Sequence, residues 1–375
     1  MKKPTNRRSF LQKVLALTSG ALVISKTGFT FNKERKVAEP LVSNLKPMGF
    51  QWETRDPFLF CVHQEDDFPQ GNTQMGPAAS LQGRDLGQDF MIKDGWRMYH
   101  GRKVPGFPGH PHRGFETITV VRKGMVDHSD SLGASGRYGN GDVQWMTAGE
   151  GVLHAEMFPL LKQEEKNPLE LFQIWLNLPA KNKMVDPHFK MMWNENLPKQ
   201  THTDGNGRKT KVEVVVGRLA NDKAPSPPPN SWAAAEENEV AIYNVRMEAD
   251  AEWTLPKASP GLNRDIYFYE GNELNAEGIK VPHYHKAELK SDAAIRLRSG
   301  KDISHFLILQ GKPISEPVVQ HGPFVMNSKE EIRQAFADYQ RTQFGGWPWG
   351  NMDPVHPRNR GRFAIHADGR EEYRR

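Results

Sequence analysis

The chain has 375 residues, of which 37% are hydrophobic and 25% are charged, a composition typical of globular proteins with one or two domains. The formal net charge of +5 comes from the first 36 residues, where nine lysines and arginines accompany one acidic residue, so the remainder is slightly acidic. This distribution argues against a nucleic-acid-binding protein, and no segment after the first 30 residues approaches the roughly 20 apolar residues that span a bilayer.

The N-terminal segment, residues 1–30, combines a basic start with an apolar run from Val14 to Ile24. This run is too short for a spanning helix and suits the core of a signal peptide. The pair Arg7-Arg8, followed by Ser-Phe-Leu, resembles a twin-arginine export signal. We therefore expect the twin-arginine machinery to export the protein to the periplasm. An amphipathic first helix and an uncleaved signal that anchors the chain in the membrane are the alternatives, because no clear cleavage site follows.

Short strands separated by turns follow this segment. The apolar run DPFLFCVH holds Cys61, which we expect to be buried and structural, since a lone cysteine excludes an intramolecular disulfide. Stretches such as FETITVVRK and KVEVVVGRL are rich in Val, Ile and Thr, and a second set from EVAIYNVRM to SHFLILQG repeats their strand–glycine–strand rhythm. Such closely spaced strands with almost no helix predict an all-β chain of sandwiches or barrels. The proline-rich insert Asn221–Trp232 reads as a loop.

One helix is predicted near the end of the chain, in the stretch NSKEEIRQAFADYQ. Ser328 and Glu331 have the spacing of a capping box, and Ile332, Phe336 and Tyr339 form an apolar face. The tail after this helix is rich in Gly, Pro and Arg, and we expect it to be irregular.

Two short motifs could together bind a metal ion. His110 and His112 are two residues apart in GHPHRGFET, so both imidazoles project to the same face of an extended strand. His154 and Glu156 in LHAEM have the same spacing. Either pair alone occurs often at surfaces and in turns. Two such strands facing one interior would supply three histidines and a carboxylate, a set that suits Fe(II), Mn, Ni, Co, Cu or Zn.

Glu116 competes with Glu156 for the carboxylate position. The spacing His-x-His followed by Glu after three further residues resembles the first cupin motif, in which that glutamate commonly binds the metal. Both carboxylates in contact with the ion would make a crowded, doubly negative site. The residues alone leave the choice between the two glutamates open.

The longer motifs resemble one family. GHPHRGFETITVVRKGMVDHSDSLG, GDVQWMTAGEGVLHAEM, FQIWLNLPAKNKMVDPHFK and PVVQHGPFVMNSKEEIRQA are similar to pirin sequences, over about residues 56–339. The resemblance implies two cupin barrels (double-stranded β-helices, or jelly rolls) stacked as a bicupin: an N-terminal cupin at 45–180 with a metal, a C-terminal cupin at 181–325 without one, and a short helix and irregular tail at 326–375. The leader, the insert and the long tail depart from the family pattern.

The same resemblance implies the site and its chemistry. The metal ligands carried over are His110, His112, His154 and Glu156, with one divalent ion, most often iron as Fe(II). Glu116 becomes a neighbouring group that supports the site. Relatives with quercetin 2,3-dioxygenase activity imply an oxidoreductase that uses O2 on a flavonol or similar hydroxy-carbonyl compound, with Glu156 also accepting a substrate proton. We expect a monomer whose partners are a small-molecule substrate and O2, with no nucleic acid.

Two other functions remain open from the sequence. One is a non-catalytic, metal-dependent binding or regulatory protein, as animal pirins are when they act as transcription cofactors; the export signal argues against it. The other is a Zn or Mn hydrolase or isomerase on the same scaffold, which no sequence motif supports.

The second half of the chain also contains a pair of histidines, His283 and His285, but no His-x-Glu motif lies near them. His305 and His321 are in the wrong context to complete a site, so we expect His283 and His285 to be a surface pair. Trp145 could wall the metal pocket or belong to the core.

Overall fold

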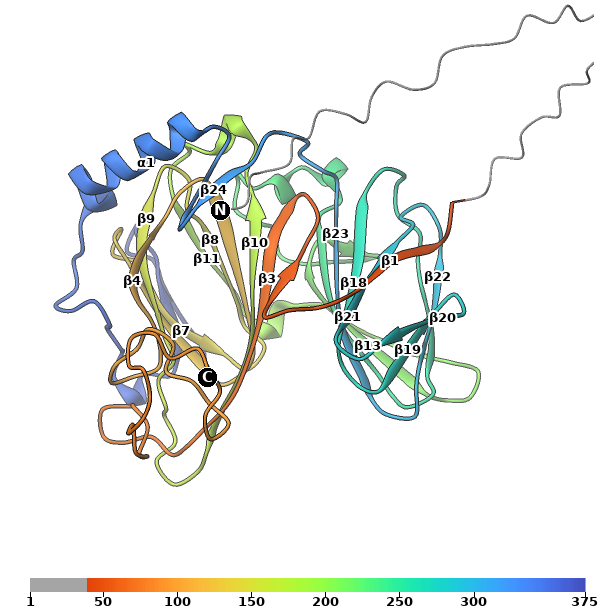
Figure 1. Ribbon diagram of the computed structural model, residues 1–375, viewed down its shortest axis with the longest axis horizontal. Helices are drawn as coiled ribbons and strands as arrows, with labels where there is room; N and C mark the ends of the chain where they lie inside the picture. Colours follow the sequence, from red (N-terminus) through yellow and green to blue (C-terminus); the bar gives the residue numbers. More distant parts are fainter. Residues whose placement is uncertain (1–38, 375) are drawn as a thin grey trace, which may run out of the picture. The chain divides into compact units, whose positions relative to one another are not determined.

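The computed structural model describes residues 39–374, and every structural statement below concerns that part of the chain. The leader, residues 1–30, lies outside it. The described residues form two β-barrels, each built from two antiparallel sheets, with one α-helix beside the first barrel (Figure 1). The all-β, two-barrel architecture expected from the sequence is confirmed. No helix in residues 39–374 is long and apolar enough to cross a membrane.

Two six-stranded sheets make the first barrel. One has the order β11-β8-β5-β10-β3-β2, with β2 (Gln51–Glu53), β3 (Phe58–Phe68), β5 (Phe115–Lys123), β8 (Val143–Thr147), β10 (Asn167–Asn177) and β11 (His188–Met192). The other has the order β27-β26-β7-β6-β9-β4, with β4 (Gly106–His112), β6 (Met125–Asp130), β7 (Ser135–Gly139), β9 (Val152–Met157), β26 (Arg362–Ile365) and β27 (Glu371–Arg374).

The second barrel pairs a seven-stranded sheet with a four-stranded one. The larger has the order β1-β21-β18-β23-β16-β13-β12, with β1 (Val42–Pro47), β12 (Lys199–Thr203), β13 (Lys209–Val216), β16 (Ala241–Met247), β18 (Asn263–Glu270), β21 (His285–Leu289) and β23 (Ser304–Gly311). The smaller has the order β17-β22-β19-β20, with β17 (Glu252–Leu255), β19 (Glu273–Ala276), β20 (Ile279–Pro282) and β22 (Ile295–Ser299).

Short elements connect and cap these sheets. They are the ladders β14 (Arg218–Leu219) with β15 (Asp222–Lys223) and β24 (Val319–His321) with β25 (Phe324–Met326), the helix α1 (Lys329–Thr342), and the 3-10 turns η1 (Ala180–Asn182), η2 (Asn194–Asn196), η3 (Trp232–Ala234), η4 (Glu236–Asn238), η5 (Gln343–Gly345) and η6 (Arg358–Arg360). The predicted capping box is present: the Ser328 hydroxyl accepts from the Glu331 amide, and the Glu331 carboxylate accepts from the Ser328 amide.

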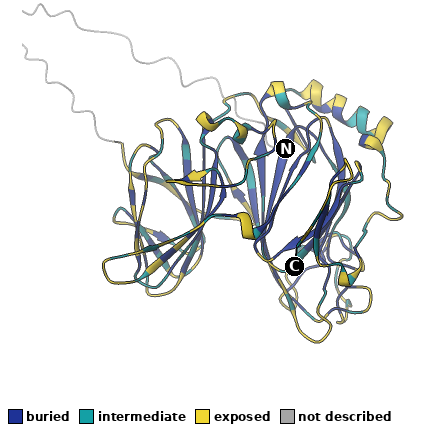
Figure 2. Ribbon diagram, turned by 180° about the vertical axis from the view of Figure 1, so that it is seen from behind, coloured by how far each residue is buried: buried dark blue, intermediate teal, exposed yellow. Residues whose placement is uncertain are grey.

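Strands β5, β8 and β9 of the first barrel are buried on both faces over most of their length, and Figure 2 shows buried residues as dark ribbon. In β5, Val121 packs with the apolar interior of this barrel, whereas Ile118 and Val120 pack against the second barrel. Cys61 and Trp145 belong to this layer between the barrels, so Cys61 is buried as expected and Trp145 is a core residue. The sequence of a strand that is covered on both sides is a nearly continuous run of apolar residues. This accounts for the many apolar residues in the β5 stretch FETITVV.

The C-terminal tail returns to the first barrel and extends its sheet. β26 pairs with β7 and β27 pairs with β26, two strands that the Gly- and Pro-rich sequence did not indicate. Between α1 and β26, the Met352 carbonyl accepts from the amide of Gly109 at 2.6 Å. The tail therefore braces the outer side of β4, the strand that carries two of the candidate ligands.

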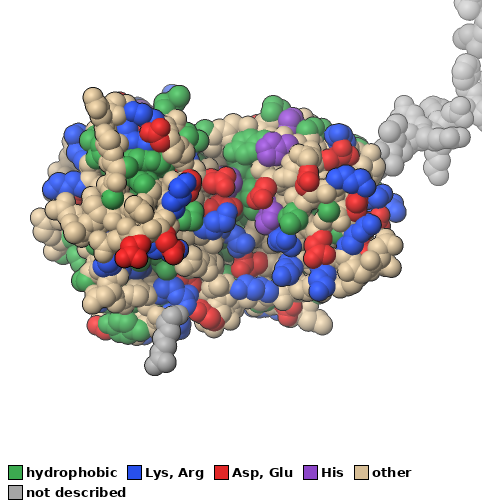
Figure 3. All heavy atoms as spheres, turned by 90° about the horizontal axis from the view of Figure 1, so that it is seen from below, with side chains coloured by type: hydrophobic (Ala, Val, Ile, Leu, Met, Phe, Trp, Pro, Cys, Tyr) green, Lys and Arg blue, Asp and Glu red, His purple; other side chains and the backbone are tan. Residues whose placement is uncertain are grey.

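Surface charge is mixed. Lys and Arg side chains alternate with Asp and Glu side chains on the face seen in Figure 3. This pattern agrees with the near balance of 50 basic and 45 acidic residues over the whole chain. A surface with interspersed charges favours solubility over the binding of a polyanion.

Candidate metal centre

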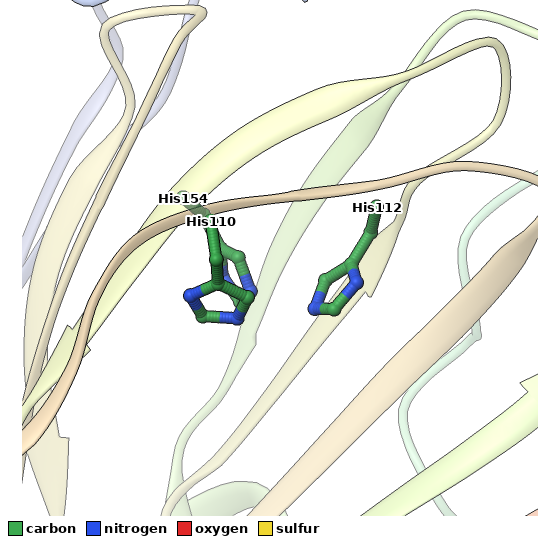
Figure 4. A group of neighbouring side chains, drawn as sticks. All are labelled: His110, His112 and His154. Atoms are coloured by element: carbon green, nitrogen blue, oxygen red, sulfur yellow. The ribbon is translucent and has the colours of Figure 1, made fainter. Parts of the chain in front are cut away.

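The pairing of two strands brings the three candidate histidines together. β4 and β9 are antiparallel neighbours, and His110 lies directly opposite His154. His112 is two residues further along β4 and therefore faces the same interior. The three rings each offer one nitrogen, and these atoms lie within 4.8 Å of one another (Figure 4). The two histidines of the His-x-His motif thus project to the same face, as expected, and β9 supplies the third imidazole.

A tight backbone follows the ligand strand. Gly114 has a φ of +84°, and a Cβ at this position would lie 2.0 Å from the Val325 carbonyl oxygen of β25. Only glycine tolerates both conditions. The buried amine of Lys183 donates to the carbonyls of Gly114 and Val325 at 2.8 and 3.1 Å. The C-terminal segment therefore holds the loop after His112 in place.

Backbone carbonyls orient two of the imidazoles. His110 Nδ1 lies 2.9 Å from the Pro108 carbonyl oxygen, and His112 Nδ1 lies 3.4 Å from that of Pro323. Since a carbonyl only accepts, each Nδ1 carries the proton and each Nε2 keeps a lone pair. This arrangement is the usual one for histidines that bind metals.

The third imidazole makes no hydrogen bond with the described residues. Both ring nitrogens of His154 are buried and make no hydrogen bond, a state that costs free energy unless another group binds there. Burial lowers the pKa of His110 to about 4 and lowers the pKa values of His112 and His154 well below the usual range. Three neutral imidazoles with converging nitrogens fit a divalent metal ion.

Glu156 lies beside the triad but is held by other groups. Its Oε2 is 3.9 Å from His154 Nε2 and accepts from Gln173 Nε2 at 2.8 Å. Its Oε1 is 3.0 Å from the Thr119 hydroxyl oxygen, which is also 2.8 Å from Gln173 Oε1. The hydroxyl has one proton, so it can donate a full hydrogen bond to only one of these two oxygens at a time. Burial raises the pKa of Glu156. The ligand atoms within 4.8 Å of one another come from the three histidines and do not include this carboxylate.

A cavity of about 220 Å³ opens onto these groups. Its lining includes His110, His112, Glu156, Thr119 and Gln173. The remaining walls are mainly aromatic and come from the loop before β2, from β3, β4 and β10, from the long loop between β3 and β4, and from the residue that follows β9: Phe50, Phe60, Phe90, Phe107, Phe158 and Trp175. Such a lining suits a flat, largely apolar molecule with a few polar groups.

Sequence comparison identifies the family. The Pirin family pattern matches residues 45–176, and the Pirin C-terminal cupin domain pattern matches residues 242–345. A Pseudomonas aeruginosa protein named "Putative quercetin 2,3-dioxygenase PA3240" is 38% identical over 242 residues, which cover 63% of this chain and 79% of that protein. This chain belongs to the pirin family. Mouse pirin is 36% identical over 253 residues, which cover 66% of this pirin and 80% of the mouse protein.

Solved structures share the fold of this pirin. A quercetin 2,3-dioxygenase from Acinetobacter baumannii superposes with a TM-score of 0.64 at 24% identity, covering 81% of this chain and 98% of that one. A second structure of that name from the same organism gives a TM-score of 0.60 at 19% identity, covering 84% and 94%. At these identities the likeness establishes the bicupin fold and leaves the activity to other evidence.

Glu116, expected to support the metal centre, faces away from it. Its carboxylate accepts from the hydroxyls of Thr147 and Ser231 at 2.7 and 2.5 Å. Ser231 belongs to the insert Asn221–Trp232, which reaches back to the first barrel and is a loop as predicted except for the short strand β15 and the first residue of η3. Burial raises the pKa of Glu116 to about 7. In this pirin the glutamate of the first cupin motif therefore joins the insert to the first barrel.

Sequence reasoning missed three residues around the site. Thr119 and Gln173 form hydrogen bonds with Glu156. The sequence did contain a signal for Gln173, because it is a polar residue within the apolar run LELFQIWLNL.

The third residue is His128, whose ring centroid lies 5.5 Å from that of His154. Its Nε2 is 3.2 Å from an Asp130 carboxylate oxygen, and its Nδ1 is 3.4 Å from the amide nitrogen of Gln144. Both nitrogens of His128 are thus engaged outside the triad.

The second barrel has a different interior. Apolar side chains from both of its sheets fill it, among them Val214, Ile266, Phe268 and Ile308. His283 is exposed and His285 is half-buried, and the Nδ1 of each bonds a backbone carbonyl. Both histidines lie outside this core.

Proposed function

We propose that this pirin is a metal-dependent dioxygenase of the quercetin 2,3-dioxygenase type, acting on a flavonol or a similar hydroxy-carbonyl compound with O2. The observation that carries the proposal is the triad of neutral imidazoles, with a buried carboxylate beside it, at the end of an aromatic cavity. The names of related proteins from Pseudomonas aeruginosa point to the same reaction.

His110, His112 and His154 would hold the ion, with Glu156 as the fourth ligand carried over from the family. A bound divalent ion, Fe(II) in our proposal, with Mn, Ni, Co, Cu and Zn as alternatives, would supply a Lewis-acidic centre where a hydroxy-carbonyl group becomes more acidic and O2 can react. The aromatic walls would bind the flat substrate and exclude water from it.

Glu156 is the residue placed to accept the substrate's hydroxyl proton. Its buried carboxylate has a raised pKa, which makes it a better base than an exposed glutamate. The amide of Gln173 and the hydroxyl of Thr119 hold its two oxygens, so the carboxylate keeps one orientation while a proton arrives or leaves.

The direct test is metal analysis of the purified protein together with O2 uptake on quercetin. We expect about one metal ion per chain and O2 uptake that depends on the flavonol and is lost when the metal is removed with a chelator. A metal-loaded protein that consumes no O2 with any of several flavonols would contradict the dioxygenase proposal. A wild-type protein without metal would contradict the site itself.

We further propose that the leader directs export to the periplasm after folding. If the protein folds before export, it binds its ion in the cytoplasm, and the ions available there determine which one is bound. Affinity alone would favour copper or zinc. Cells that express the full chain should contain it in the periplasmic fraction, whereas the variant Arg7→Lys/Arg8→Lys should accumulate in the cytoplasm. Equal distribution of the two proteins would refute twin-arginine export.

A further inference from the structure

The outer face of the seven-stranded sheet carries charged residues beside its contact with the first barrel. On this face, Leu307 of β23 belongs to the apolar cluster that joins the two barrels (Figure 1). Val212 of β13 and Val245 of β16 belong instead to the core of the second barrel. Because side chains alternate along a strand, their neighbours Lys211 and Arg246 project to the outer face.

Lys211 and Arg246 are directly opposite each other in the β13–β16 ladder. Like charges at directly opposite positions repel each other and destabilise the pairing of two strands. Neither side chain forms an ion pair or a hydrogen bond within residues 39–374. The same row continues with Thr201 beside Lys211, and with His305 and then Glu270 beyond Arg246. The nearest carboxylate of this row is therefore two strands away from Arg246.

A cavity of about 400 Å³ opens over this row, between the two barrels. Its lining includes Lys211 and Arg246, together with Lys199 of β12 and Arg122 of β5, and all four side chains are at least partly exposed. Of the described residues that line it, Glu213 alone is acidic. Its carboxylate accepts from Arg122 and lies 3.8 Å from Lys199. Glu213 therefore offsets these two cations and leaves Lys211 and Arg246 uncompensated.

The rest of the cavity lining is polar apart from Val212: Asn140, Gly141, Asn194, Gln200, Thr201 and Asn244. A cleft lined mainly by one sign of charge concentrates the electrostatic potential and attracts ions of the opposite sign. The chain after residue 36 is slightly acidic as a whole, so the positive charge in this cleft is local. Two adjacent uncompensated cations among amides and a hydroxyl suit a small, polar, doubly charged anion.

We propose that this cleft binds a phosphate group, either free or as the ester of a small molecule. The guanidinium of Arg246 and the ammonium group of Lys211 would donate to its oxygens. A phosphate ester carries nearly two negative charges above neutral pH, which matches the two uncompensated cations and replaces their repulsion by attraction to one ligand. None of the described residues lines both this cleft and the metal cavity, so the site is separate from the metal centre.

Calorimetry on the full chain, at about pH 8 and constant ionic strength, tests the site with glycerol 3-phosphate, inorganic phosphate and acetate. We expect the phosphates to bind at least about 10-fold more tightly than the singly charged acetate, and more weakly as the salt concentration is raised. Tighter binding of glycerol 3-phosphate would identify an ester as the ligand, and equal binding would identify free phosphate. Acetate binding as tight as that of the phosphates, or no binding of either phosphate, would overturn the proposal.

The variant Arg246→Gln locates the binding and separates a ligand-binding role from a structural one. It should weaken phosphate binding about 10- to 100-fold. Its Tm without ligand should equal or exceed that of wild type, because the repulsion from Lys211 is relieved. The matched control is Arg298→Gln, which removes an exposed arginine from β22 in the smaller sheet and should bind phosphate like wild type. Equal affinities in the two variants would overturn the site.

Two further variants complete the test. If Arg246→Gln does not fold, Lys211→Gln should show the loss of phosphate binding instead, since the Lys211 side chain is exposed and its removal leaves the packing of the strands unchanged. His154→Ala should bind phosphate like wild type. Loss of phosphate binding in His154→Ala would place the phosphate at the metal centre and would refute the separate site.

Discussion

Replacing His154 with alanine should abolish metal binding and, with it, flavonol-dependent O2 uptake. His154 is the fully buried member of the triad, and neither of its nitrogens makes a hydrogen bond with residues 39–374, so the loss of this imidazole breaks no hydrogen bond of the described fold. Loss of a group that only supports a ligand commonly costs about 10- to 100-fold in metal affinity, and loss of a ligand should exceed that. We expect metal content below about a tenth of wild type after dialysis, measured by elemental analysis.

The control for this variant is His283→Ala in the second barrel, an exposed histidine whose Nδ1 bonds the Gly271 carbonyl. It should keep wild-type metal content and O2 uptake. Circular dichroism and denaturation of the metal-free forms should show both variants folded. Normal metal content in His154→Ala would mean that the ion binds elsewhere, and equal loss of metal in His283→Ala would place a ligand in the second barrel.

The sequence predicted the features that depend on neighbours along one strand. His110 and His112 share a face because they are two residues apart, and the same holds for His154 and Glu156. The spacing of strands and glycines predicted the barrels, and the capping box predicted the start of α1. Each of these signals spans only a few residues, so no knowledge of strand pairing was needed.

What the sequence could not indicate depends on register between distant strands. Gln173 lies directly opposite Thr119 in the β10–β5 pair, and a shift of one residue would turn Gln173 away from Glu156. Glu116 looked like a ligand because its spacing fits a motif, yet its hydroxyl partners come from β8 and from the insert 115 residues later. In β18, Nε and Nη1 of the buried Arg264 make no hydrogen bond with the described residues, and this too is visible only when every neighbouring element is in place.

One buried arginine makes several of the contacts that attach the tail to the first barrel. Arg137 on β7 is fully buried and donates to both carboxylate oxygens of Asp127 at 2.6 and 2.7 Å. It also donates to the carbonyls of Pro357, Arg358 and His356, and the His356 amide donates to Asp127. One guanidinium therefore binds a buried carboxylate of the barrel and three backbone carbonyls of the tail at once.

Arg137→Leu should lower the free energy of unfolding by about 3–5 kcal/mol, because Asp127 would be left as an uncompensated buried charge. Urea denaturation measures this loss. Limited proteolysis should release the tail, and metal retention should weaken as the Met352 brace on Gly109 is lost. The exposed pair Arg333–Glu330 on α1 provides the control: Arg333→Leu should cost less than about 1 kcal/mol. If the two variants lost equal stability with the tail protected in both, Arg137 would not be the residue that attaches the tail.

The double variant Asp127→Leu/Arg137→Leu should regain part of the stability that Arg137→Leu loses, since it removes the unpaired carboxylate of Asp127 as well as its arginine partner.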